Sequence, residues 1–210
     1  MAKLNDVVRR VGMYGGEIAL ELSFDAMAFV DCREAEWQTE CAGLRDRHAA
    51  TSLGVTGGVE QVLGHSSLEV MSSVYADIAH RFGWLTLDRP LSSVEYEHVR
   101  ESAADWCRHD RTKSDVVREF GVPTVLIGGG NPSYPNTLGY GTSDPARPLT
   151  FFHVWNGTAP GETDNWPPSR KEPVLLCVSH RADGGFQQDF VFTLYGSSRR
   201  ASTSDRRIPQ

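Results

Sequence analysis

The most constraining feature of this sequence is a change in its apolar pattern at Gly121. Before this glycine, apolar residues recur at spacings of three and four, which is the period of amphipathic helices. After it, short apolar segments are separated by Gly, Pro, Asn and Asp, which is typical of strands and turns. Because the two patterns are segregated along the chain, the sequence predicts an α+β fold. We expect a helical N-terminal half packed with a C-terminal antiparallel sheet of four or five strands.

The expected helices differ in how clearly they are marked. The clearest has a single apolar stripe, made by Leu68, Met71, Tyr75, Ile78 and Phe82. Ser66 followed by Glu69 fits a capping box at its start. The expected helices cover residues 67–82, 92–109 and 114–120, and a fourth, with a blurred apolar period, covers 17–36.

The expected strands cover residues 122–127, 137–141, 149–155, 174–180 and 186–195. Residues 182–185 read Ala-Asp-Gly-Gly, which is a signal for a tight hairpin between the last two strands. In the final strand apolar side chains alternate with polar ones such as Asp189. We therefore expect a sheet with one packed face and one mostly polar face.

Three regions are expected along the chain. Residues 1–87 form a helical region, residues 88–196 an α+β sheet module, and residues 197–210 a Ser/Arg-rich tail. We expect the tail to be disordered, because it lacks apolar residues to bury.

The charge of the chain disfavours a nucleic-acid partner. The net charge is −6 over 210 residues, and the tail alone carries +3 from four arginines and one aspartate, which leaves −9 for the rest. A body this acidic repels a phosphate backbone. Its four cysteines are scattered, and we find neither a signal-peptide core nor a membrane-length apolar stretch. We expect a cytoplasmic protein that does not enter a membrane.

No complete catalytic or metal-binding motif is present. The sequence has neither a Gly-x-Ser-x-Gly elbow nor a His-Glu-x-x-His pair. Cys177 and His180 fall three apart in an expected strand and so lie on opposite faces, which argues against a zinc site. We therefore expect no cofactor and no metal, and we favour a non-catalytic role. An unrecognised hydrolase stays open as an alternative.

Residues 43–78 resemble the C-terminal catalytic box of the tyrosine recombinases. The similarity rests on Gly-Leu-Arg-Asp-Arg-His at 43–48, on Leu-Gly-His-Ser at 63–66, and on the tyrosine ten residues later. This resemblance implies DNA strand exchange, with Arg45 and His65 contacting the scissile phosphate and Tyr75 as the nucleophile. A structural interpretation competes with it, because Tyr75 lies in the apolar stripe of its own helix. The chain would then be a relic or variant of such an enzyme, or unrelated to it.

Residues 111–195 resemble the small α+β module of the β-lactamase-inhibitor proteins and of the small lipoproteins of outer-membrane assembly. The similarity rests on a threonine-led helix that ends in Phe-Gly-Val-Pro at 120–123 before a series of strands. The run from residue 9 to 16 is also similar to one near the start of small bacterial proteins of immunity type. These resemblances imply a protein-binding role, inhibitor-like or immunity-like, in a bacterial cytoplasm.

Three aromatic residues in the loops of the second half are the expected partner-binding site. They are Tyr134, Trp155 and Trp166. Exposed tyrosine and tryptophan are frequent hot spots of protein interfaces, and alternation of strand direction can gather such loops at one end of a sheet. The competing interpretation is that these rings close one end of the core.

The charge distribution makes a direct prediction about DNA. We expect no binding to duplex DNA at physiological salt beyond weak contacts of the arginine tail. Fluorescence polarisation with a labelled duplex, at rising salt, measures this. Tight binding by a chain cut at Gly196 would contradict the prediction, because that chain lacks the tail arginines.

Overall fold

A computed structural model describes residues 1–129, 131, 134–156 and 171–204, with side chains up to residue 200. Six helices come first: α1 (Ala2–Arg9), α2 (Val11–Tyr14), α3 (Glu17–Val30), α4 (Glu34–Asp46), α5 (Gly54–Leu63) and α6 (Leu68–Arg81). Helices α7 (Ser93–Trp106) and α8 (Lys113–Phe120) then lead into the strands. The strands are β1 (Val125–Ile127), β2 (Asn136–Tyr140), β3 (Thr150–Trp155), β4 (Val174–His180) and β5 (Phe190–Phe192). A 3-10 turn, η1 (Phe186–Asp189), precedes β5, and helix α9 (Leu194–Ser204) follows it.

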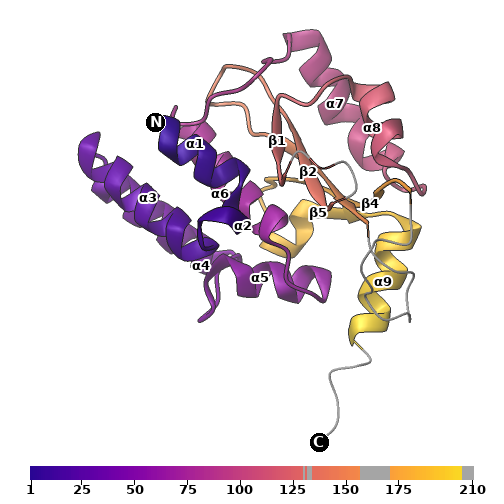
Figure 1. The fold of residues 1–210 in the computed structure, drawn as a ribbon, viewed down its shortest axis with the longest axis horizontal. Helices are drawn as coiled ribbons and strands as arrows, with labels where there is room; N and C mark the ends of the chain where they lie inside the picture. The colour runs from indigo at the N-terminus through magenta and orange to yellow at the C-terminus, as the bar shows by residue number, and fades with distance from the viewer. Residues whose placement is uncertain (130, 132–133, 157–170, 205–210) are drawn as a thin grey trace, which may run out of the picture.

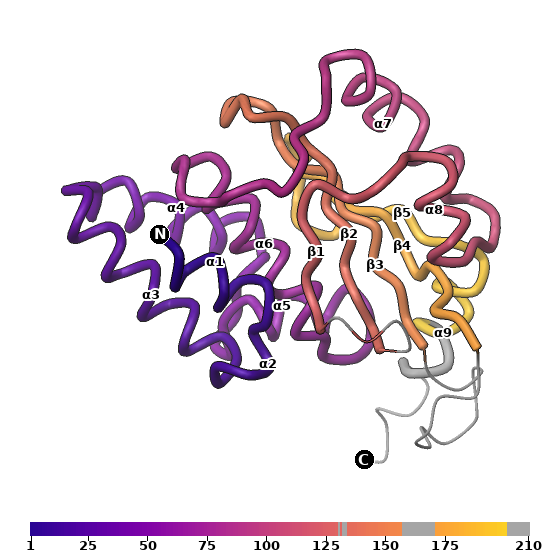
Figure 2. The backbone as a smooth tube through the Cα atoms, turned by 45° about the horizontal axis from the view of Figure 1, so that its top comes forward, coloured from indigo at the N-terminus to yellow at the C-terminus, as the bar shows by residue number. Residues whose placement is uncertain are grey.

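The strands form one antiparallel sheet (Figure 1), and their order β1-β2-β3-β4-β5 can be followed in Figure 2. The α+β class and the five-stranded C-terminal sheet are therefore confirmed. In Figure 2, α1 to α6 lie on one side of the sheet and α7 and α8 on the other. The sheet therefore lies between two helical layers that both precede it in sequence.

Both faces of the sheet are buried, and the expected polar face is a wrong prediction. One apolar cluster joins the N-terminal helices to sheet residues such as Phe151 and Cys177. A second cluster joins α7 and α8 to Phe152, Val178 and their neighbours on the opposite face. Part of the expected alternation falls outside the sheet, because Gln187 and Asp189 lie in η1 and β5 begins only at Phe190. The first cluster contains residues on both sides of residue 87, which is the expected boundary between the helical region and the sheet module. The two regions therefore share this core.

The helix ends follow capping chemistry, with two corrections. Ser92 and Glu95 form the capping box that starts α7, which agrees with the expected start. Helix α6 is capped by Ser67, whose hydroxyl accepts from the Val70 N–H, and not by Ser66. The region 17–36 is two helices, α3 and α4, because Cys32 between them adopts a left-handed φ of 53°.

The C-terminal segment also differs from expectation. Residues 186–195 are not one strand, because Asp189 turns inward. Its carboxylate accepts hydrogen bonds from the Arg47 guanidinium and from the Ala182 N–H. A long polar connection therefore replaces the tight hairpin. The expected boundary at residue 197 falls inside α9, which continues to Ser204. Gly196 allows this helix to pack against the sheet, since a Cβ there would come within 2.0 Å of the Leu176 carbonyl oxygen.

A buried polar ladder crosses the face of the sheet that meets the N-terminal helices. His153 lies between Thr137, whose hydroxyl is 2.9 Å from Nδ1, and Ser179, whose hydroxyl is 2.7 Å from Nε2. Burial lowers the pKa of His153 to about 3. The ring is therefore neutral at physiological pH, with one nitrogen donating and the other accepting.

This histidine should make folding stability sensitive to acid. Between pH of about 6.5 and about 3 the unfolded chain binds a proton on His153 that the folded chain does not, so the free energy of unfolding falls as pH falls, by up to about 1.4 kcal/mol per pH unit. Urea denaturation across this range measures the slope. The slope should be smaller by that amount in His153→Gln and unchanged in His109→Gln, whose side chain is exposed. Equal slopes in all three proteins would contradict the prediction.

Candidate functional site

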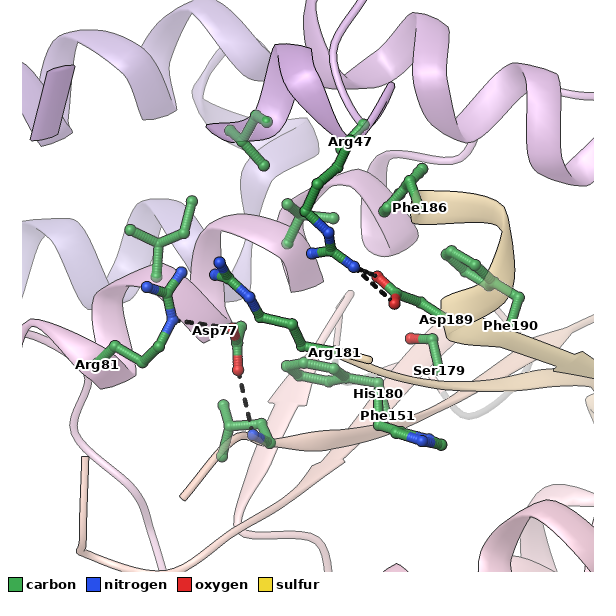
Figure 3. A pocket seen from close by; sticks show the side chains of 15 residues that line it. Arg47, Asp77, Arg81, Phe151, Ser179, His180, Arg181, Phe186, Asp189 and Phe190 are labelled. Atoms are coloured by element: carbon green, nitrogen blue, oxygen red, sulfur yellow. Dashed lines mark hydrogen bonds and ion pairs between the residues drawn. The ribbon is translucent and has the colours of Figure 1, made fainter. Parts of the chain in front are cut away.

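A pocket between the N-terminal helices and the sheet is lined by several partly buried charged side chains (Figure 3). Arg47 lies over Asp189, with Nη2 at 2.8 and 2.9 Å from the two carboxylate oxygens. The same guanidinium donates to the carbonyls of Ala182 and Gly184. Burial raises the pKa of Asp189, while Arg47 and the Ala182 N–H act in the opposite direction.

The other arginines that line this pocket also have carboxylate partners. Arg81 pairs with Asp77 at 3.2 Å and with both oxygens of Glu40. The other oxygen of Asp77 accepts the backbone N–H of Leu149 at 3.1 Å, which ties α6 to the start of β3. Arg181 lies 3.5 Å from Glu40. Because these guanidinium groups already have carboxylate partners, the pocket joins the two layers and offers no free cation to a ligand.

The outer face of α3 is the most unusual surface of the described residues. Four large apolar side chains project from it into solvent: Ile18, Leu22, Phe29 and Val30, with exposed fractions of 64–73%. The inner face of the same helix is also apolar, with Leu20, Phe24 and Ala28 fully buried. Helix α3 lies at the edge of the helical layer, away from the sheet (Figures 1 and 2). Isolated exposed apolar residues are ordinary, but a row along one helix marks an interaction surface.

A row of carboxylates runs beside this apolar face. Glu17, Glu21 and Asp25 are spaced four apart on α3, and the helix contains no basic residue. They line a pocket with an empty volume of about 830 Å³. Partial burial and the charges of Glu17 and Asp25 raise the pKa of Glu21. The acidic rim continues at Asp31, and at Glu34 in the first turn of α4. The exposed apolar face thus borders strongly negative surface.

On its other side, the apolar face opens into a shallow groove between α1 and α3. The groove has an empty volume of about 650 Å³, and its lining includes Leu4, Leu22, Met27 and Val30. The lining also contains two cationic groups, the Lys3 side chain and the ammonium of Met1. We refer below to Ile18, Leu22, Phe29 and Val30, together with this groove, as the α3 surface.

The three residues suggested by the recombinase resemblance do not converge in one site. Arg45 and Tyr75 line the acidic pocket, but His65 does not. Tyr75 is 2% exposed and its hydroxyl donates to Glu17 at 2.8 Å. Burial, and then the negative charge of Glu17, raise the pKa of Tyr75 far above its usual range. The His65 ring instead contacts the Trp155 ring edge-on, with 5.1 Å between their centroids.

The three aromatic residues predicted to bind a partner are only partly described. The β2–β3 register pairs Asn136 with Val154, so Tyr134 and Trp155 lie toward the same end of the sheet. Tyr134 is 42% exposed. Trp155 is half-buried between His65 and the Arg199 guanidinium, which lies 4.3 Å from its ring centroid. Trp166 lies outside the described residues.

No protein-family model, curated protein or solved structure matches the chain. Among the described residues, no helix is long and apolar enough to span a membrane. In the same part of the chain, no three His, Cys, Asp or Glu side chains are grouped as metal ligands. The structure itself must therefore support any functional assignment.

Sequence reasoning did not find the α3 surface, although a signal was present. The blurred apolar period of residues 17–36 reflects a helix with apolar residues on both its inner and outer faces. A helix that is apolar all round is usually buried, so the pattern by itself does not indicate exposure.

The contact between Tyr75 and Glu17 gives a prediction that separates a structural tyrosine from a nucleophile. Glu17 also accepts the N–H groups of Val55 and Thr56 at the start of α5, so Tyr75 helps to hold a junction of three helices. Tyr75→Phe should lower the free energy of unfolding by about 1–2 kcal/mol and Tyr75→Ala by about 3–5 kcal/mol. Urea denaturation measures both, with exposed Tyr14→Phe as a neutral control. Full stability of Tyr75→Phe would count against a structural role.

Proposed function

We propose that this chain is a non-catalytic protein-binding protein of inhibitor-like or immunity-like type, which binds its partner through the α3 surface. The observation that carries the proposal is the row of four large apolar side chains on α3, each at least 64% exposed. Keeping such a row in water has no benefit to the isolated fold, since transfer from water into an apolar contact stabilises each side chain by about 1.5–3 kcal/mol. A protein partner that covers the row provides this contact.

The charges around the α3 surface indicate the chemistry of that partner. Glu17, Glu21 and Asp25 border the apolar row, so the surface combines an apolar centre with an acidic rim. A second copy of the chain would place two such rims against one another, and like charges repel. A partner with an apolar helix face rimmed by lysine and arginine complements both features. We therefore propose a basic protein as the occupant.

The alternative functions have weaker support. In the recombinase alternative, Tyr75 would attack a phosphodiester, yet its hydroxyl is buried against Glu17 in an acidic pocket. Negative charge at this position repels DNA. For a hydrolase, the nearest arrangement is Ser179 beside His153, but the low pKa of that buried ring makes it a poor base.

Model peptides test the proposed partner chemistry directly. A helical peptide of leucine and lysine should bind the protein, and a leucine–glutamate peptide of the same pattern should not, in fluorescence polarisation at low salt. The double variant Leu22→Glu/Phe29→Glu should weaken binding of the basic peptide by roughly tenfold or more. Val94→Glu, at an exposed apolar position on α7, is the matched control and should bind normally.

Three further measurements guard this test. The melting temperature of the double variant should stay near that of the unchanged protein, because Leu22 and Phe29 are mostly exposed. Pull-down from host lysate should recover a basic protein that the double variant fails to recover. Sedimentation should show no dimer that the double variant dissociates. Equal binding of both peptides, or such a dimer, would overturn the proposal.

A further inference from the structure

A second polar cluster lies on the opposite face of the sheet, under α7, and has no part in the protein-binding proposal. Thr150 of β3 and His180 of β4 are directly opposed in the strand register. Thr150 is two residues from Phe152 and His180 is two residues from Val178, so both point to the same face of the sheet as these apolar residues. Phe152 and Val178 pack against α7 and α8. Figure 3 agrees for His180, whose ring points away from the Arg47–Asp189 pair on the other face.

Helix α7 brings a third polar group over this pair. Near its start, the Tyr96 hydroxyl donates to the Pro148 carbonyl at 3.0 Å, just before β3. After its last turn, the Cys107 thiol contacts the Val191 carbonyl of β5 at 3.2 Å. The helix therefore crosses from β3 over β4 to β5. Arg100 follows Tyr96 by four residues and shares its face, which directs it toward Thr150 and His180.

These groups retain unused hydrogen-bonding capacity. Thr150 is 1% exposed, and its hydroxyl has no hydrogen-bond partner among the described residues. The buried Nη1 of Arg100 likewise has none, and Arg100 forms no ion pair within the described part of the chain. Its neighbour Arg147 differs, because it pairs with Glu97 at 3.3 Å. Buried polar atoms are nearly always hydrogen-bonded in folded proteins, so each of these two atoms calls for a partner.

We propose that Arg100, Thr150 and His180 form a binding site for a small oxyanion between α7 and the sheet. The guanidinium supplies paired donors that match the oxygens of a carboxylate, phosphate or sulfate. The Thr150 hydroxyl supplies a further donor at the floor of the site, and a protonated His180 supplies a second cation. The anion would satisfy both orphaned buried atoms with charge-assisted hydrogen bonds.

The electrostatics of His180 fit this site. Burial, and then the positive charge of Arg100, lower the pKa of His180 in the free protein. Other ionisable groups around this end are Tyr96 and Glu97 on α7, Arg147 before β3, and Asp77 on α6. A bound anion reverses the effect of Arg100 and raises the pKa of His180. By linkage, the anion then binds more tightly when His180 is protonated, so affinity rises as pH falls.

Sulfate and acetate are the probes, each titrated into the full chain at constant ionic strength balanced with sodium chloride. We expect a saturable rise in melting temperature and a saturable shift of the His180 ring signal in NMR spectra with at least one probe. A response to sulfate alone identifies a tetrahedral oxyanion, and a response to acetate alone identifies a carboxylate. Arg100→Gln and Thr150→Val should each weaken the response by roughly tenfold. Arg108→Gln, at an exposed position just beyond α7, is the matched control.

The pH dependence separates this site from general salt effects. Between about pH 8 and about pH 5.5 the unchanged protein should bind the responding probe more tightly at the lower pH, and His180→Gln should lose this dependence. The ring signal of His180 in the unchanged protein keeps the test valid if a variant fails to fold. The proposal is overturned if neither probe gives a saturable response, or if Arg100→Gln responds as strongly as Arg108→Gln.

Discussion

Both faces of the five-stranded sheet are apolar, and the rest of the architecture follows from covering them. Phe151 and Cys177 contact the N-terminal helices, while Phe152 and Val178 contact α7 and α8. A sheet buried on both sides needs a layer on each side, and the chain supplies them from segments that precede every strand. Apolar burial is non-directional, so it brings the layers together but does not fix their relative positions. The relative positions of the layers are fixed by the ion pairs between α4, α6 and the sheet.

For these ion pairs, the place of each pair in the structure matters more for stability than how many pairs there are. Arg47 reaches Asp189 across most of the sequence, and Asp77 accepts the N–H at the entry to β3. Removing one member would leave a partner charge half-buried, which is far more costly than losing an exposed pair. The pocket in Figure 3 therefore has the composition of a binding site but serves as a joint between layers.

The contrast between satisfied and unsatisfied polar groups separates structure from candidate function. The ring of His153 uses both nitrogens within the sheet, so the Thr137–His153–Ser179 ladder is complete by itself. On the other face, Thr150 and Arg100 each keep a buried atom without a hydrogen-bond partner in the described residues. The same logic holds for apolar groups on α3: the inner row is fully packed, while the outer row stays mostly exposed to water. Each of our two proposals rests on a feature that the isolated fold leaves incomplete.

The sequence by itself determined the local elements. Helical periodicity located α6 and α7, Ser92 with Glu95 marked a helix start, and the apolar stripe correctly placed Tyr75 in the core. These features depend on neighbours three or four residues away, which a sequence pattern records directly. Tertiary structure alone decided which apolar surfaces are covered. The period of α3 cannot tell an inner face from an outer one, and the inward turn of Asp189 depends on Arg47, 142 residues away. Whether a residue is buried depends on what packs against it. Contacts between distant segments produce no repeating pattern in the sequence, so the sequence pattern does not predict them.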